Sequence, residues 1–327
     1  MARRFSTTAE VRRSMDRLHA LRNDPPAVRD LAREILPGEA NPDLLLLALQ
    51  SLGDGASFSD REVLRELYSW LEQDFSRRDT TGTVRVEVLR VLWHLRSRED
   101  LDIAEAAARR SEPSMSESDR VIRAAGLALL GVLDPEAAAH RAATILALCD
   151  SAQMSGEPAL TAARLLGSLG HTVALTAHLL NSPPGEPPEV TAECLRGLSG
   201  LPLPWIQPVL DLYVESPSSI LLLGLADLIV SLEPGQAVDS TVRGMLANAP
   251  TPEVYGFLTT AIVASRRSDL LATLLRSLPT EMLHARLRLA HEALQFAPLT
   301  PGVSTAIAAL QSRLDATPPQ SLHEAPE

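Results

Sequence analysis

Apolar residues recur along most of this chain at the spacing of an amphipathic α-helix. The clearest stripe lies within residues 83–95, where apolar side chains fall at positions i, i+4, i+7, i+8 and i+11. These positions are Val84, Val88, Val91, Leu92 and Leu95. Residues 252–265 repeat the stripe, and no window shows the alternation of strands joined by hairpin turns. The pattern therefore predicts an all-α protein with essentially no β-sheet.

The predicted helices form a unit that recurs along the chain. Each unit opens with a turn signal, continues as a helix rich in Ala, Leu and Val, and closes at Gly, Asp or Pro. The eight units start near Asn41, Thr83, Ser118, Glu157, Pro187, Pro217, Pro252 and Glu281. The steps between starts are 42, 35, 39, 30, 30, 35 and 29 residues. A drifting period of this length predicts a right-handed α-solenoid of about eight stacked antiparallel helix pairs.

Shifts in composition divide the chain into three parts. Residues 1–40 form two short helices that carry eight Arg and few large apolar residues, which is typical of a polar cap at the end of a solenoid. Residues 41–314 contain the repeats. Residues 315–327 are polar and contain Pro318 and Pro319, so we expect a flexible tail.

One predicted helix, residues 218–232, is apolar nearly all round, which is typical of a helix buried on most sides. Its polar residues form a single narrow line of Gly224, Asp227 and Ser231. Asp227 is open to two interpretations. It is either a functional carboxylate whose pKa is raised by burial or, more commonly in such helices, a group that bonds a neighbouring helix.

Two segments carry a pattern of a polar start, a Val before a charged or small residue, an Ala-rich helix and a Leu–Gly–Leu-like end. They are SDRVIRAAGLALLGVLDP at 118–135 and PPEVTAECLRGLSG at 187–200. These segments resemble HEAT repeats, especially the short bacterial kind also found in phycobilin lyases, and the resemblance covers residues 41–298. It implies a HEAT- or armadillo-like fold whose concave face holds a partner, because most HEAT proteins are scaffolds or adaptors. The Arg usual early in the first helix is present at Arg85 and Arg120 and absent from the later repeats.

Composition narrows the possible chemistry. Aromatic residues make up only 3% of the chain and hydrophobic residues 45%, so the core must be aliphatic. All 30 basic residues are Arg, which excludes Schiff-base, phosphate-loop and kinase-type lysines. Coding bias in a G+C-rich genome explains this absence more simply than selection against lysine modification. The net charge of −11 lacks the basic footprint of a nucleic-acid binder and disfavours such a partner.

No motif predicts a catalytic or metal centre, so we expect no cofactor. Two histidine pairs share a seven-residue spacing, His171 with His178 and His284 with His291. Each pair supplies two ligands, whereas a metal site needs three or four. Gln295 stands where the zincin motif HExxH requires its second histidine.

Nothing in the sequence predicts export or a membrane anchor. The first residues contain charges and no apolar h-region, unlike a secretory signal. The longest apolar run, Ile220 to Leu232, is too short to span a bilayer and contains Asp227. The two cysteines, Cys149 and Cys194, fit small core positions. We therefore expect a cytoplasmic protein, and its oligomeric state stays open.

An Arg-rich segment in the first three repeats is the best candidate for a partner-binding surface. Its ten members are Arg77, Arg78, Arg85, Arg90, Arg96, Arg98, Arg109, Arg110, Arg120 and Arg123. Guanidinium groups suit carboxylates and phosphates. The alternative is a solvated face of mixed charge, because acidic residues such as Glu87 and Glu105 interleave with these Arg residues.

Three functions fit these observations. The repeats and the lack of a catalytic constellation favour a non-catalytic scaffold or adaptor that holds a protein or peptide on the face of its second helices. A nucleic-acid-binding protein similar to the HEAT-like alkylpurine DNA glycosylases would need a basic concave stripe with aromatic residues. A lyase- or chaperone-like HEAT protein acting on a small cofactor would need a pocket with a convergent acid and an Arg.

Overall fold

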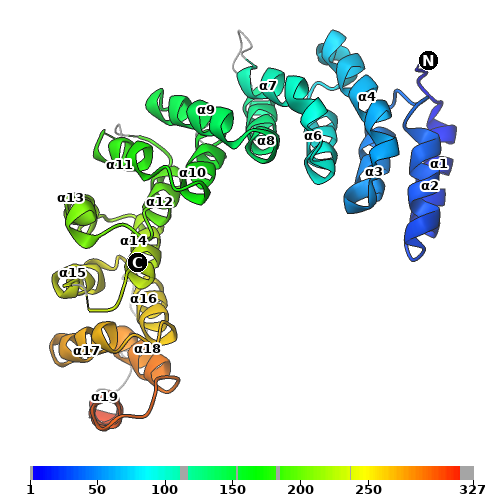
Figure 1. The fold of residues 1–327 in the computed structure, drawn as a ribbon. Helices are drawn as coiled ribbons and strands as arrows, with labels where there is room; N and C mark the ends of the chain where they lie inside the picture. The colour runs from blue at the N-terminus through cyan, green and yellow to red at the C-terminus, as the bar shows by residue number, and fades with distance from the viewer. Residues whose placement is uncertain (1–2, 111–116, 152–153, 182–184, 236, 317–327) are drawn as a thin grey trace, which may run out of the picture. The chain divides into compact units, whose positions relative to one another are not determined.

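The computed structural model describes residues 3–110, 117–151, 154–181, 185–235 and 237–316. Within these ranges the chain forms nineteen α-helices and four short 3-10 helices (Figure 1). The same residues contain no strand, only two isolated bridges. The all-α prediction is confirmed. None of the helices in these ranges is both long enough and apolar enough to cross a bilayer.

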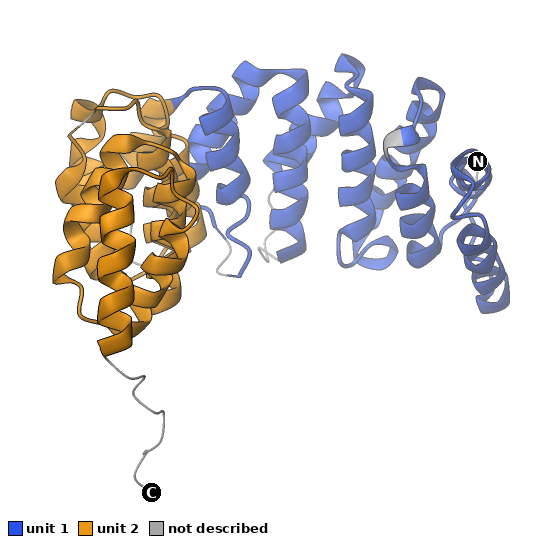
Figure 2. Cartoon of the chain, turned by 90° about the horizontal axis from the view of Figure 1, so that it is seen from below, with its two compact units in different colours: residues 1–171 blue, residues 172–327 orange. Residues whose placement is uncertain are grey.

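The chain divides into two compact units, residues 1–171 and residues 172–327 (Figure 2). Unit 1 contains ten helices in its described part. They are α1 (Thr8–Ala20), α2 (Pro25–Ile35), α3 (Pro42–Leu52), α4 (Arg61–Gln73), α5 (Phe75–Arg78), α6 (Thr83–Leu95), α7 (Leu101–Arg109), α8 (Glu117–Leu133), α9 (Pro135–Ala147) and α10 (Ala159–Ser168). The expected unit starts near Asn41, Thr83, Ser118 and Glu157 correspond to α3, α6, α8 and α10.

Helices in unit 1 pack mainly against neighbours in chain order. The helix α3 packs against α6, α6 against α8, and α8 against α7, α9 and α10. Side chains that cap the N-termini explain why several of these helices start where they do. The Asn41 side chain accepts a hydrogen bond from the backbone of Leu44 at 3.1 Å, and Asp134 accepts one from Ala137 at 3.1 Å. A proline follows each cap at the first helical position, where its missing N–H costs nothing.

Unit 2 contains nine helices in its described part. They are α11 (Thr172–Asn181), α12 (Pro188–Arg196), α13 (Leu203–Tyr213), α14 (Ser219–Ser231), α15 (Asp239–Asn248), α16 (Pro252–Ala264), α17 (Ser268–Ser277), α18 (His284–Leu294) and α19 (Pro301–Ala316). Helices α12, α14, α16 and α18 pack against one another in series. The other helices of the unit pack as α11 with α13, α15 with α17 and α17 with α19.

The two ends of the chain differ slightly from the expected boundaries. Val11, Leu18 and Leu31 of the predicted cap share one buried cluster with Leu44, so α1 and α2 pack directly on α3. The last helix α19 extends to Ala316 and includes the first two residues of the expected tail. The rest of that tail, residues 317–327, lies outside the described residues.

In each unit a glycine lies very close to the backbone of a neighbouring helix. A Cβ on Gly126 of α8 would lie 2.5 Å from the Cβ of Ala107 on α7. A Cβ on Gly224 of α14 would lie 2.8 Å from the Cα of Ala192 on α12. Real side chains do not approach this closely, so both helix pairs need glycine for their separation.

The apolar helix predicted at 218–232 is α14, and six of its residues are buried. Asp227 is an exception, because its side chain is 45% exposed and accepts a hydrogen bond from the Nε of Arg196 on α12 at 2.7 Å. The carboxylate therefore bonds a neighbouring helix at the surface. The alternative of a carboxylate buried among apolar residues is wrong.

Candidate interaction surfaces

A buried ionic cluster surrounds Arg85, on the first turn of α6. The Arg85 side chain is 2% exposed. Its Nε donates to Asp79 at 3.0 Å, and its Nη1 donates to Glu72 at 2.9 Å. Asp79 also accepts hydrogen bonds from the backbone of Val84 and Arg85, so it stabilises the start of α6. Arg85 belongs to the interior of unit 1.

Arg110 extends this cluster toward α8. Its guanidinium forms an ion pair with Glu72, the carboxylate that Arg85 also binds, and its Nε lies 3.0 Å from Asp119. The Phe75 ring contacts both guanidinium groups, with centroid distances of 5.3 Å to Arg85 and 4.8 Å to Arg110. The cluster thus links α4, α5, α6 and α8 through charges that protein groups already satisfy.

A second set of ion pairs joins helices that lie two or three helices apart along the chain, through Arg residues absent from the predicted surface. Arg33 of α2 binds Asp60 with two hydrogen bonds of 2.8 and 3.1 Å. The Nε of Arg61 donates to Asp100 at 2.9 Å, and Arg65 binds Asp100 and Asp102. Asp60 and Asp100 each stand directly before a second helix, α4 or α7. This shared position is a local feature of the two Asp residues in the sequence, but it does not identify their Arg partners.

The structure distributes the ten predicted Arg residues between interior and surface. Arg85 is buried, and Arg78, Arg110, Arg120 and Arg123 are half-buried. The exposed members are Arg77, Arg90, Arg96, Arg98 and Arg109. Several carry intramolecular partners: Arg78 lies over the Trp70 ring, Arg96 lies over the Trp93 ring, Arg90 binds Glu87, Arg109 binds Glu105 and Arg123 binds Asp150. Of the ten Arg residues, the five exposed members remain candidates for the predicted charged surface.

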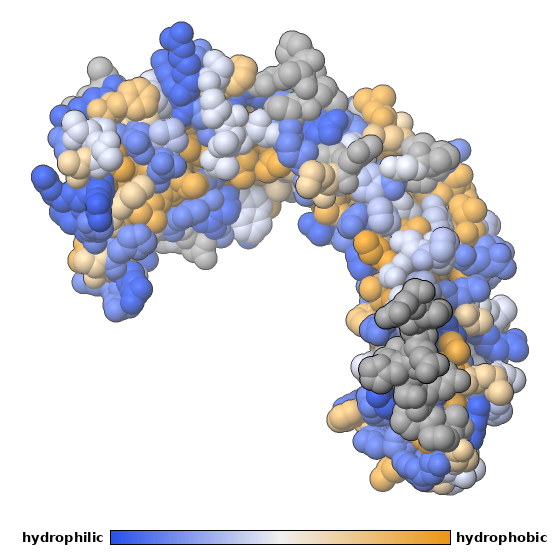
Figure 3. All heavy atoms as spheres, turned by 180° about the vertical axis from the view of Figure 1, so that it is seen from behind, coloured by the Kyte–Doolittle hydropathy of each residue, from blue (hydrophilic) through white to orange (hydrophobic). Residues whose placement is uncertain are grey.

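Figure 3 shows hydrophilic side chains interspersed with apolar ones on the visible face of unit 1. This mixture agrees with the composition of the unit, which contains 22 Arg and 26 acidic residues. Unit 2 contains 8 Arg and 15 acidic residues, and it exposes more large apolar side chains. Trp205 is 68% exposed, Met282 81% and Phe296 85%.

An open apolar groove of about 840 Å³ lies in unit 2, between α19 on one side and α17 with the 3-10 helix η4 (Leu278–Thr280) on the other. Its lining residues are Leu275, Leu278, Pro279, Met282, Pro301, Gly302, Thr305, Ala306, Ala309, Leu310 and Arg313. The α19 side of the groove consists mainly of small side chains, which leave space against the leucines of α17 and η4. Arg313 is already bound, because its Nη1 donates to the carbonyl of Leu278 at 2.9 Å.

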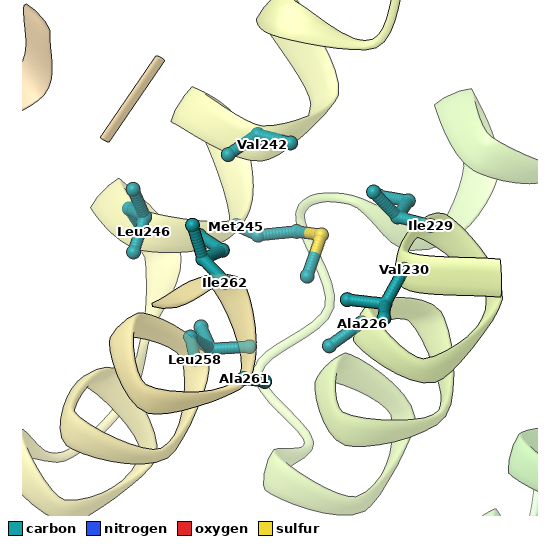
Figure 4. A pocket seen from close by; sticks show the side chains of 9 residues that line it. All are labelled: Ala226, Ile229, Val230, Val242, Met245, Leu246, Leu258, Ala261 and Ile262. Atoms are coloured by element: carbon teal, nitrogen blue, oxygen red, sulfur yellow. The ribbon is translucent and has the colours of Figure 1, made fainter. Parts of the chain in front are cut away.

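The interior of unit 2 holds a much smaller cavity, of about 10 Å³, between α14, α15 and α16 (Figure 4). Ala226, Met245 and Leu258 are among its entirely apolar lining, and the thioether of Met245 points between the other two helices. This volume is close to the minimum for a single water molecule. The cavity is therefore a packing gap and leaves no room for a cofactor.

Among the predicted histidine pairs, His178 of α11 is buried and its Nε2 lies 2.9 Å from Glu186. Burial raises the pKa of the nearby Cys194 thiol, and the negative charge of Glu186 adds to the rise. A thiol held in its neutral form is a core residue, as the sequence predicts.

Comparison with known proteins identifies no relative. No protein-family description matches the chain, and neither the curated proteins nor the solved structures contain a significant match.

Proposed function

We propose that this protein is a HEAT-like, right-handed α-solenoid of about eight helix pairs that holds a partner protein or peptide. Packing between neighbours in chain order, within each unit, supports this architecture. So does the agreement between the eight expected unit starts and helices α3, α6, α8, α10, α12, α14, α16 and α18. The proposed partner is a polypeptide because the net charge of −11 disfavours nucleic acid.

The observation that carries the function is the open groove between α17, η4 and α19. Its volume of about 840 Å³ is within the range of ligand-binding clefts, and its walls are mainly apolar. Met282, at its edge, is 81% exposed, and such flexible side chains adapt to varied apolar partners. An amphipathic helix or extended peptide would bury its apolar side chains in this groove.

Two matched substitutions on α19 test this function. Ala309 lines the groove, whereas its exposed neighbour Ala308 does not. Ala309→Trp fills the groove, and Ala308→Trp places the same ring outside it. In co-purification at physiological salt, we expect a partner to bind the wild type and Ala308→Trp and to lose at least about tenfold in affinity for Ala309→Trp.

Two results would contradict the proposal. One is the absence of any specific partner at physiological salt. The other is a partner that binds both variants equally, which would remove the groove as its site. Circular dichroism of each variant checks that the helical content is unchanged.

A further inference from the structure

A small cavity with a cationic rim lies in unit 1, separate from the groove of unit 2. It has a volume of about 80 Å³ and lies where α7, α8 and α9 meet. Its lining residues are Glu105, Ala108, Arg109, Leu130, Ala137, His140 and Arg141. This volume holds several water molecules or one small polyatomic ion.

Arg141 on α9 is the distinctive member of this lining. Its side chain is half-buried, and within the described part of the chain no carboxylate or carbonyl forms a hydrogen bond or an ion pair with it. Burial lowers the pKa of Arg141, and the positive charges of Arg109 and Arg123 lower it further. Glu105 is the acidic group that opposes this effect.

The charges around Arg141 do not balance. Arg109 binds Glu105 through one nitrogen, with an Nη2–Oε2 distance of 3.0 Å, and Arg123 binds Asp150 at 2.5 Å. The two carboxylates therefore match two of the three guanidinium groups and leave the charge of Arg141 uncompensated. A partly desolvated guanidinium gains most from an anion that accepts two parallel hydrogen bonds.

We propose that this cavity binds a phosphate group. Arg141 would donate the principal pair of hydrogen bonds, and Arg109 would contribute donors that its single bond to Glu105 leaves free. His140, exposed at the rim, adds a further donor. The site does not depend on the apolar groove, so it stands or fails independently of the proposed scaffold function.

Calorimetric titration of the full-length protein with inorganic phosphate, at constant ionic strength, tests the site. We expect Arg141→Gln to weaken phosphate binding at least about tenfold, because it removes a charged bidentate donor. Arg13→Gln, at an exposed position on α1, removes the same charge outside the cavity and should leave the affinity unchanged. Absence of phosphate binding to the wild type, or equal affinity of both variants, would overturn the proposal.

A substitution that is expected to increase phosphate affinity distinguishes binding at this cavity from a purely structural effect. Glu105 competes with the ligand for Arg109 and repels an anion, so Glu105→Gln should strengthen phosphate binding several-fold. A variant that merely loosened the fold would not bind more tightly. If Glu105→Gln leaves the affinity unchanged or weakens it, the anion is not bound at this cavity.

A peptide titration identifies where the phosphate resides. A phosphoserine peptide that binds more tightly than inorganic phosphate, and loses this binding with Arg141→Gln, indicates a phosphorylated partner. Equal affinity for inorganic phosphate and the phosphopeptide indicates the free ion. A peptide that binds equally well without its phosphate would contradict recognition of this group.

Discussion

Among the Arg residues that bridge helices, one set in unit 1 and one set in unit 2 bind different acceptors. In unit 1, Arg33, Arg61 and Arg65 reach carboxylates of Asp60, Asp100 and Asp102. In unit 2, three Arg residues instead reach backbone carbonyls near the ends of helices. They are Arg267, which donates to Ile229 and Leu232; Arg286, which donates to Leu246 and Ala249; and Arg313, which donates to Leu278 and Glu281.

Arg residues can therefore hold helices together through two kinds of electrostatic interaction, with helix-end carbonyls or with carboxylates. A carbonyl at a helix C-terminus lacks an intrahelical donor and carries a partial negative charge, so an Arg there satisfies a dipole. A buried carboxylate carries a full charge and must be neutralised by its partner. Loss of an Arg should therefore cost more stability in unit 1 than in unit 2.

The largest expected effect is at Arg85. Arg85→Met leaves Asp79 buried beside a neutral side chain and should reduce the stability of unit 1 by about 3–5 kcal/mol. The matched variant Arg267→Met leaves carbonyls without a donor and removes the partner of Asp269, a carboxylate that is 27% exposed, so it should cost unit 2 about 1–3 kcal/mol. Hydrogen exchange of the full chain, resolved by peptide, measures the loss of protection in α4–α6 and in α14–α17.

The comparison between the units fails if Arg267→Met is the more destabilising change. It fails equally if Arg85→Met leaves the protection of α4–α6 unchanged. Arg13→Met, at an exposed position on α1, controls for the general effect of removing a positive charge.

A smaller effect should be the same in both units, because it concerns helix separation and not charge. Gly126→Ala and Gly224→Ala place a Cβ within 2.9 Å of neighbouring backbone atoms, so each should cost about 1–3 kcal/mol. A Cβ on Gly131 would meet the flexible end of Leu165, and one on Gly244 would meet a single methyl group of Val214, in neither case backbone, so Gly131→Ala and Gly244→Ala are matched controls. The same hydrogen-exchange measurement should show little change for these controls.

If Gly126→Ala and its control Gly131→Ala lose the same hydrogen-exchange protection, the close contact of α8 with α7 does not limit the stability of unit 1. The corresponding comparison of Gly224→Ala with Gly244→Ala applies to unit 2. A loss of stability in one unit alone would show that only this unit depends on the close helix contact at its glycine.

Local signals made the helices predictable from the sequence. The cap–proline pairs Asn41–Pro42 and Asp134–Pro135 fix where α3 and α9 begin, because they act within one turn. Arg85 was predicted at the surface because it lies off the apolar stripe of its helix. It is buried because Phe75 and Asp79 of the preceding segment cover that side of α6.

Contacts between helices that are far apart in the sequence were not predictable in the same way. The bonds from Arg61 to Asp100 and from Arg33 to Asp60 join residues 39 and 27 positions apart, so they depend on how whole helices stack. The groove of unit 2 likewise depends on the distance between α17 and α19. Small residues such as Ala306 and Ala309 are compatible with either a close helix contact or an open groove, and the sequence alone does not distinguish them.

The smallest expected effect concerns pH and again contrasts the units. The hydrogen bonds from Arg267 lower the pKa of Asp269 to about 2. A carboxylate with a lowered pKa stabilises the folded state above its unfolded pKa of about 3.9, and this contribution disappears as the pH falls toward 2. Asp269→Asn should therefore cost up to about 2 kcal/mol at pH 7, and its difference from the wild type should vanish between about pH 4 and pH 2.

In unit 1, Arg65 also lowers the pKa of Asp102, but that side chain is 63% exposed, so Asp102→Asn should cost less than about 1 kcal/mol. Urea unfolding at pH 7, 4 and 2 measures both differences, and a larger pH-dependent loss at Asp102 would reverse the expected order.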